Sequence, residues 1–289
     1  VRGEIVRTWP MSGTLHLLAR EDVRWMVALL APRVQAANAA RIARDVGFDA
    51  PALAHGRQVM EQALRDGVPV ARSELYARLD AAGIASGNQR GLHLLNWLAH
   101  EGAICQGPRH GKQPTFVLMD AWVPPSAPLG RDEALHRLAL RYLQGHGPAT
   151  AADLAWWSGL TQKDALRALE LAGPALEKET RDGTTWWWRA DAPIPARSRA
   201  IHLLPAFDEY LIGYRDRTPV LDAAHTRRVF GVNGLVAATA IIQGRVVATW
   251  KRAGDTNVAL APLRALADAE HEGIQRAAQR WRRFLGDAR

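Results

Sequence analysis

The residues whose types and spacing most suggest chemistry with a partner lie on one side of a predicted helix. The helix is expected to start at a capping box formed by Ser86 and Gln89. At roughly 100° per residue, leucines fill one side of this helix. The opposite side presents Arg90, His93 and Trp97. A polar, basic and aromatic face of this kind suits the major groove of DNA, so we predict that these three side chains bind DNA.

Two short strands, Ala103–Gln106 and Thr115–Leu118, are predicted after this helix. The loop between them carries Arg109, His110 and Lys112 at its tip. A hairpin with a cationic tip suits the DNA backbone or the minor groove, and a helix followed by such a hairpin is the plan of a winged helix. We therefore predict that the three tip residues also bind DNA.

Structural alternatives stand beside these assignments. The helix face with Arg90, His93 and Trp97 is also suited to packing against a neighbouring module. His16, on a hairpin predicted near the start of the chain, is a further candidate for a contact with a DNA base. Its alternative is a structural histidine with satisfied hydrogen bonds.

The best candidates for acid chemistry are Asp208 and Glu209, at a predicted junction between a strand and a turn. They are acids beside a DNA-facing groove, or members of a salt-bridge and tyrosine network that fixes the β-rich part of the chain to the winged helices, and we favour the network. The sequence lacks the spacings typical of metal-binding histidines and cysteines, phosphate-binding loops and serine nucleophiles. We expect no metal and no cofactor.

Composition limits the partner and the environment. The 289 residues carry a net charge of +8, which favours a polyanionic partner, although a preference for arginine codons in a GC-rich genome is an alternative explanation. The single cysteine, Cys105, excludes intrachain disulfides and fits a reducing cytosol; we interpret it as a packed small residue. Apolar runs are shorter than a membrane span needs, and we expect a bacterial cytoplasmic, nucleoid-associated protein.

The elements that position these residues predict an α+β fold. Tandem winged-helix modules are expected to precede a small C-terminal β-barrel-like domain with a closing helix. The predicted domains are a remnant of a first winged helix at 1–55, winged helices at 56–122 and 131–190, and a β-rich domain at 199–289. The opening strands, Ile5–Met11 and Thr14–Leu18, are interpreted as the wing of a first module whose helices lie upstream, so the chain is expected to start inside a domain.

Apolar periodicity and capping residues predict the remaining elements. Helices are expected at Glu21–Leu30, Arg33–Val46, Gly56–Asp66, Arg72–Ala82, Asp132–Gln144, Ala151–Ser158, about 161–172 and Pro262–Leu285. Strands are expected at Ala175–Thr180, Thr184–Arg189, Ile201–Leu204, Leu235–Gln243, Arg245–Arg252 and Val258–Leu260. Two pairs of landmarks, Ser86 with Thr161 and Gly107 with Asp182, are both 75 residues apart, which indicates a duplicated architecture.

Several short motifs resemble one family. They are LPAFDEY at 204–210, GYRDR at 213–217, VNGL at 232–235, VVATWKR at 246–252, VRTWPMSGTLHLL at 6–18 and PATAADLAWWSGL at 148–160. Their types and order are similar to those of the tandem winged-helix DNA glycosylases that repair interstrand crosslinks (AlkZ/YcaQ-like), over nearly the whole chain.

The resemblance implies a concave DNA-binding surface built from winged helices and a β-barrel. It also implies cleavage of the N-glycosidic bond of alkylated or crosslinked purines. In the family a Gln-x-Gln or Gln-x-Asp motif in the first module carries the chemistry, and neither Gln35-Ala36-Ala37 nor Gln162-Lys163-Asp164 stands in that position. The catalytic residues therefore stay unassigned. The expected partner is double-stranded DNA, including damaged DNA, bound by a monomer; the alternative function is a winged-helix DNA-binding protein without catalysis.

Overall fold

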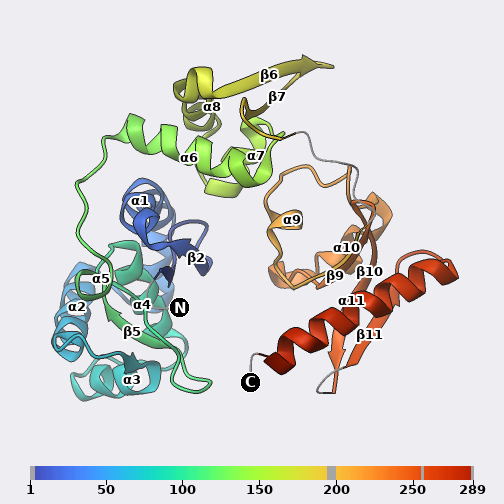
Figure 1. Ribbon diagram of the computed structural model, residues 1–289. Helices are drawn as coiled ribbons and strands as arrows, with labels where there is room; N and C mark the ends of the chain where they lie inside the picture. The colour runs from blue at the N-terminus through green and yellow to red at the C-terminus, as the bar shows by residue number, and fades with distance from the viewer. Residues whose placement is uncertain (1–3, 194–199, 255–256, 288–289) are drawn as a thin grey trace. The chain divides into compact units, whose positions relative to one another are not determined.

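The computed structural model describes residues 4–193, 200–254 and 257–287, and the chain divides into two compact units, residues 1–189 and 190–289 (Figure 1). The first unit contains most of the helices and a five-stranded sheet. The second contains a four-stranded sheet and a long closing helix. The predicted α+β class is confirmed. Among the described residues, none of the helices is long and apolar enough to cross a membrane.

A single helix, α1 (Val23–Arg41), follows a short turn at Arg20–Asp22 and continues into a π-helical segment, η2 (Ile42–Val46). The prediction of two helices separated at Pro32 was wrong, because Pro32 lies inside α1. Proline removes one backbone hydrogen bond, but Leu30 and Ala31 just before it are buried, and their packing keeps the helix continuous. As predicted, Gly47 ends the segment, with a left-handed φ of 71°.

Three helices follow, α2 (Ala50–Leu64), α3 (Arg72–Ala81) and α4 (Arg90–His100). The first starts before the predicted Gly56, because the Asp49 side chain caps it by accepting a hydrogen bond from the Ala52 backbone N–H at 2.9 Å.

The capping box predicted at Ser86 was wrong. The Ser86 backbone N–H and hydroxyl both donate to the Asp80 carboxylate, at 2.8 and 3.0 Å. Gln89 has a left-handed backbone, so α4 begins only at Arg90. Gly91 is required in the first turn of α4, because a Cβ there would lie 2.5 Å from the Tyr76 ring of α3.

The sheet of the first unit has the strand order β2-β1-β4-β5-β3. Its members are β1 (Ile5–Thr8), β2 (His16–Ala19), β3 (Val70–Ala71), β4 (Ile104–Gln106) and β5 (Thr115–Leu118). The predicted opening hairpin and the predicted wing strands are both present, and they share this one sheet because β1 pairs with β4. Trp9, just after β1, stacks on Phe116 of β5 with ring centroids 6.3 Å apart.

The order of elements repeats in the next part of the unit. After the short α5 (Met119–Trp122), three helices lead to a hairpin: α6 (Arg131–His146), α7 (Ala151–Ser158), α8 (Gln162–Ala172), β6 (Leu176–Arg181) and β7 (Thr184–Arg189). In the first copy β3 pairs with β5 just before α3, and in the second Ala149 forms the equivalent bridge with Trp187 just before α7. This shared pairing is independent of the spacing argument and supports the predicted duplication.

The second unit is built on an antiparallel sheet with the order β11-β10-β9-β8. Its elements are β8 (Ile201–Leu204), α9 (Glu209–Ile212), η4 (Ala223–His225), α10 (Thr226–Val229), η5 (Val232–Gly234), β9 (Thr239–Ile242), β10 (Arg245–Ala253), β11 (Asn257–Pro262) and α11 (Asp268–Asp287). In the described residues the sheet is open, and no closed barrel forms.

Two element boundaries in this unit differ from the predicted ones by more than two residues. The strand predicted to start at Leu235 starts at Thr239, because the chain before it forms the η5 turn and a single bridge between Phe230 and Val236. The closing helix begins at Asp268, because Pro262 is still paired with Ala248 in the sheet. Periodicity alone does not reveal either boundary, since both depend on pairing with distant strands.

Candidate nucleic-acid interface

The loop between β4 and β5, residues 107–114, is a fixed projection of the first unit. His110 and Gln113 exchange backbone hydrogen bonds at 3.1 and 3.0 Å, and Gly111 between them has a φ of 59°. At the base of the loop the Thr115 hydroxyl donates to the Pro108 carbonyl at 2.5 Å. The loop therefore holds its tip in one shape, which suits a surface that must meet a regular polymer.

The three predicted tip residues, Arg109, His110 and Lys112, are all exposed. Within the described part of the chain, none of them forms an ion pair. Two exposed cations without a carboxylate partner concentrate positive potential at the tip. Their binding to DNA stays a prediction, and their placement is what that prediction requires.

Arg7 is a further cation beside this loop, and sequence reasoning missed it. It lies on β1 opposite Gln106, which is the last residue of β4 before the loop begins. Burial and the nearby positive charge of Arg109 both lower the pKa of Arg7, so the two guanidinium groups lie within electrostatic reach of each other. The only sequence signal for Arg7 was its alternation with the buried Val6 and Thr8; its proximity to the loop follows from the β1–β4 pairing. We call Arg7, Arg109, His110 and Lys112 the wing cluster.

His16 is placed differently. It lies on β2 opposite Thr8, which is one residue along β1 from Arg7, so His16 and Arg7 occupy opposite faces of the sheet. Its Nε2 is 2.7 Å from the Thr14 hydroxyl. The structure therefore places His16 on the opposite face of the sheet from Arg7, and its contact with a DNA base stays a prediction.

The predicted face of α4 is turned toward α1 and η2. The Arg90 guanidinium donates to the Val46 carbonyl and, at 3.0 Å, to the Ala85 carbonyl, and it lies 4.8 Å from the centroid of the Phe48 ring. These contacts match the packing alternative for this helix. DNA contact by Arg90 is untested, and we leave Arg90 out of the proposed DNA surface because its donors already serve the fold.

Trp97 and His93 share this environment. Trp97 packs on the hydrophobic core, and its indole N–H donates to the Glu101 carboxylate at 2.8 Å. Gln35 of α1 donates to the Trp97 carbonyl at 3.3 Å. Burial lowers the pKa of His93, and the nearby Arg41 lowers it further. These contacts favour the packing alternative for His93 and Trp97, whose binding to DNA stays a prediction, and the wing cluster is the stronger candidate.

Two partly buried histidines of α4, His93 and His100, predict that the stability of the first unit depends on pH. Burial lowers the pKa of His93 and of His100, and the His100 Nε2 is buried without a hydrogen-bond partner in the structure. Below the unfolded pKa of about 6.5, the unfolded chain binds more protons than the folded one, so the free energy of unfolding falls as the pH falls. We expect the Tm of the first unit to drop between pH values of about 7.5 and 5.5.

A His93→Gln/His100→Gln variant should flatten this pH dependence in thermal unfolding followed by circular dichroism. The matched control is His55→Gln/His110→Gln, which changes two exposed histidines. An equally steep dependence in the first variant and the unchanged chain would contradict the assignment.

Asp208 and Glu209 lie in the second unit. The Asp208 carboxylate caps α9 by accepting a hydrogen bond from the Tyr210 backbone N–H at 3.0 Å, and the Tyr210 hydroxyl donates to the Gly244 carbonyl at 2.6 Å. Burial raises the pKa of Tyr210. These contacts give Asp208 a structural role within the second unit, and the predicted network that fixes this unit to the winged helices stays a prediction. Among the described residues, no group of three or more histidines, cysteines or carboxylates is placed to hold a metal ion.

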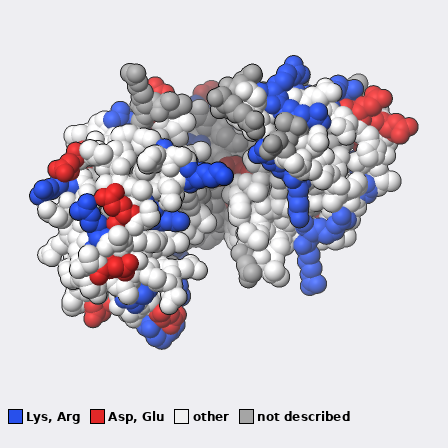
Figure 2. All heavy atoms as spheres, turned by 90° about the horizontal axis from the view of Figure 1, so that it is seen from below, with Lys and Arg blue, Asp and Glu red and all other residues white. Residues whose placement is uncertain are grey.

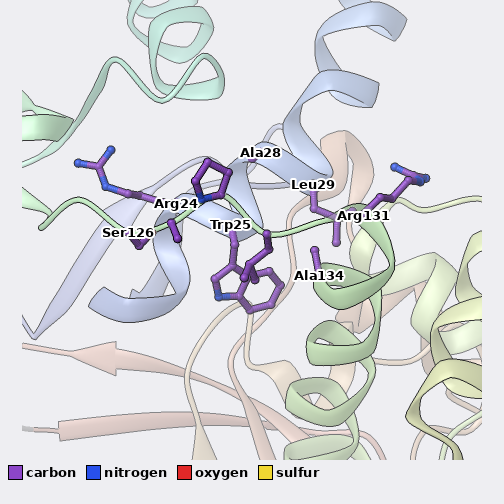
Figure 3. A pocket seen from close by; sticks show the side chains of 10 residues that line it. Arg24, Trp25, Ala28, Leu29, Ser126, Arg131 and Ala134 are labelled. Atoms are coloured by element: carbon purple, nitrogen blue, oxygen red, sulfur yellow. The ribbon is translucent and has the colours of Figure 1, made fainter.

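A surface pocket of about 370 Å³ lies between α1, the connector at 126–129 and the start of α6 (Figure 3). Trp25 and Leu29 line it, and Arg24 and Arg131 lie on its two sides. Both arginines are engaged: Arg24 pairs with Asp120 at 2.9 Å and Arg131 with Asp164 at 3.0 Å. Because carboxylates neutralise both arginines, the pocket offers little free positive charge to an anionic ligand. We therefore interpret it as part of the packing between the two winged-helix copies.

The second hairpin is a poor candidate for phosphate contact. Arg181 pairs with Glu179 at 2.9 Å, and Asp182 follows in the turn.

Cys105, as predicted, is a buried packed residue. Burial raises the pKa of its thiol to about 12, which makes it a poor nucleophile.

Basic side chains also cover part of the second unit. In Figure 2, blue atoms are spread over the visible face of this unit, and most of its red atoms gather at one end. On α11, Asp268 and Glu270 lie in the first turn and four arginines follow, at 276, 280, 282 and 283. Arg280 donates to the Ile201 carbonyl at 2.8 Å, so part of this charge anchors α11 to β8.

Comparison with known proteins connects this geometry to a chemistry. The family model described as DNA glycosylase AlkZ-like matches residues 1–284. An interstrand DNA cross-link repair glycosylase from Streptomyces sahachiroi is 28% identical over 273 residues, which cover 86% of this chain and 70% of the relative. The solved structure of the Streptomyces sahachiroi DNA glycosylase AlkZ is similar with a TM-score of 0.77, at 24% identity, over 96% of this chain and 80% of that one. At this identity the structural likeness shows the fold.

Proposed function

The chain belongs to the DNA glycosylase AlkZ-like family, and from this premise we propose that it binds duplex DNA containing alkylated or crosslinked purines and hydrolyses the N-glycosidic bond of the modified base. The crosslink substrate is suggested by the relative that is named an interstrand DNA cross-link repair glycosylase. The wing cluster is proposed to bind the phosphate backbone.

The proposed reaction is a hydrolysis. The bond between the purine nitrogen and C1′ of the sugar breaks, and the base leaves with the bonding electrons. Water adds to C1′ and loses a proton, so the products are a free base and an abasic site. Alkylation at N7 gives the purine a positive charge, which makes it a better leaving group and leaves the protein to position the water and stabilise the oxocarbenium-like sugar.

We assign no catalytic residue in this chain. The family resemblance places the reaction on a Gln-x-Gln or Gln-x-Asp motif, which the residues after Gln35 and Gln162 do not match in position. Gln35 in addition donates its side-chain amide to the Trp97 carbonyl and so serves the contact between α1 and α4. The proposed contribution of the described residues is DNA binding and orientation.

The observation that carries the proposal is a cationic projection within a chain that the family model matches over nearly its full length. Arg109 and Lys112 have exposed charges on a loop that backbone hydrogen bonds hold in one shape. Arg7 adds a third cation from β1.

The test is incubation of the chain with a duplex that holds one N7-methylguanine, followed by alkali, which cleaves DNA at abasic sites. The expected result is strand cleavage at the lesion and none in the undamaged duplex. Binding to a preferred undamaged sequence without cleavage would instead support the alternative, a winged-helix DNA-binding protein without catalysis.

A further inference from the structure

The segment Gly231–Leu235 of the second unit, which we call the apolar loop, exposes two aliphatic side chains. Val232 is 84% exposed and Leu235 is 62% exposed. The ends of the loop are tied together, because the Gly231 N–H donates to the Leu235 carbonyl at 2.8 Å. Just outside it, Phe230 and Val236 form a bridge, and the Ala237 N–H donates to the Val229 carbonyl at 2.9 Å. The loop is thus a closed projection with a defined base.

The fold does not need the two exposed side chains for its core. Val229 and Val236, on either side of the loop, are buried in the hydrophobic core of the second unit. The partly buried Phe230 packs against the same core, and the Arg217 guanidinium lies 4.5 Å from the centroid of its ring. The chain therefore buries its apolar residues up to the base of the loop and exposes them only at the tip. Exposing aliphatic side chains at a tip forgoes burial energy of about 25 cal/mol per Å², so a binding role accounts for them better than a structural one.

The charge of the chain on either side of the apolar loop favours an anionic partner. Residues 213–245 contain five arginines and two aspartates. Both aspartates accept local backbone hydrogen bonds, Asp216 from Thr218 and Asp222 from Ala224, each at 2.9 Å. On α10, directly before the loop, Arg227 and Arg228 are exposed. Arg228 donates to the Pro262 carbonyl at 3.0 Å, a contact that does not neutralise its charge. An apolar tip beside exposed positive charges is complementary to a polyanion with an apolar interior, such as duplex DNA.

We propose that the apolar loop is a wedge that inserts Val232 and Leu235 between base pairs of duplex DNA from the minor groove. DNA-bending proteins insert aliphatic side chains in this way while neighbouring cations hold the phosphates. Partial unstacking lowers the cost of turning a damaged base out of the helix, which an enzyme acting on a base must achieve. This inference rests on the proposed DNA glycosylase function. Within that function, the apolar loop is the part of the chain that unstacks the duplex at the damaged base.

The experiment uses a duplex with 2-aminopurine beside an N7-methylguanine, because 2-aminopurine fluoresces more strongly when unstacked. The full chain, a Val232→Ser/Leu235→Ser variant and a Phe284→Ser control are compared at saturating protein, with saturation established by fluorescence anisotropy. Phe284 is 67% exposed on α11 and lies outside the loop, so its replacement removes an exposed apolar side chain without touching the wedge.

The expected result is a fluorescence rise with the full chain and the control, and loss of most of that rise with the double variant although it still binds. An equal rise with the double variant, or binding without any rise in the full chain, would overturn the wedge. If the full chain bound no duplex at all, the proposed function would fail as well. Capture of the full chain but not the double variant on phosphatidylserine vesicles, with no change in 2-aminopurine, would assign the loop to a lipid surface and also overturn the wedge.

Discussion

Replacement of Arg109 and Lys112 by alanine is expected to weaken binding to undamaged B-form duplex roughly 30-fold at about 0.15 M salt. Each cation that neutralises a phosphate releases counterions, and each contact contributes about 0.9 to the slope of log affinity against log salt concentration. The double variant should therefore lower that slope by about 1.8, and its affinity should approach that of the unchanged chain near 1 M salt.

The salt series separates phosphate contact from a general effect of net charge. The matched control is Arg65→Ala/Lys163→Ala, which removes the same charge from two exposed positions of the first unit outside the wing cluster. We expect the control to keep the slope of the unchanged chain. The two variants are compared by fluorescence anisotropy at several salt concentrations, and equal slopes would remove the wing cluster from the DNA surface.

Asp22→Ala is expected to destabilise the first unit by removing a buried polar contact. Asp22 is largely buried just before α1, and its carboxylate accepts from the Trp25 indole N–H at 3.0 Å and pairs with Arg141 of α6, also at 3.0 Å. The substitution leaves the buried indole N–H without an acceptor and removes the tie between α1 and α6. Because Arg141 is half-exposed, its ion pair adds little, and we expect a total loss of about 2 kcal/mol, or roughly 4–8 °C in Tm.

Two further variants make this result specific. Asp22→Asn keeps an acceptor for Trp25 and should lose less. Glu21→Ala removes a neighbouring, largely exposed carboxylate that lies 3.6 Å from Arg141, and it should change the free energy of unfolding by less than about 0.5 kcal/mol. Equal losses for Asp22→Ala and Glu21→Ala in denaturant unfolding would show that the contact between Asp22 and Trp25 contributes nothing.

Local signals in the sequence predicted much of the secondary structure. The bounds of α7 and β8 were predicted to the residue, and α8 starts after Thr161, whose side chain accepts from the Asp164 N–H at 3.0 Å. These features depend on caps, turns and alternation within a few residues. The exposed tip of the wing, with Arg109 and Lys112, was predicted from the same kind of signal.

The remaining features depend on contacts between distant segments. Pairing of β1 with β4 joins residues about 100 positions apart, and it alone brings Arg7 beside the wing. Pro32 was predicted to end a helix, but packing of α1 keeps the helix continuous through it. The polar face of α4 was predicted to meet DNA, with packing against a neighbouring module as the alternative. Arg90 bonds to the carbonyl of Val46, and no periodicity within α4 encodes that partner. Contacts between distant segments decide which strands pair, where a helix ends and what its polar face meets, and an amphipathic pattern alone does not.

Base release from a crosslinked duplex is the sharpest test of the proposed glycosylase function. The chain is incubated with a duplex joined through N7 of guanines on opposite strands, and the products are separated under denaturing conditions and identified by mass spectrometry. The expected products are separated strands, one carrying an abasic site, and their rate of formation should be lower in the Arg109→Ala/Lys112→Ala variant at subsaturating protein. Crosslinked strands that stay joined, together with no free base from an N7-methylguanine duplex that the chain demonstrably binds, would contradict the proposed function.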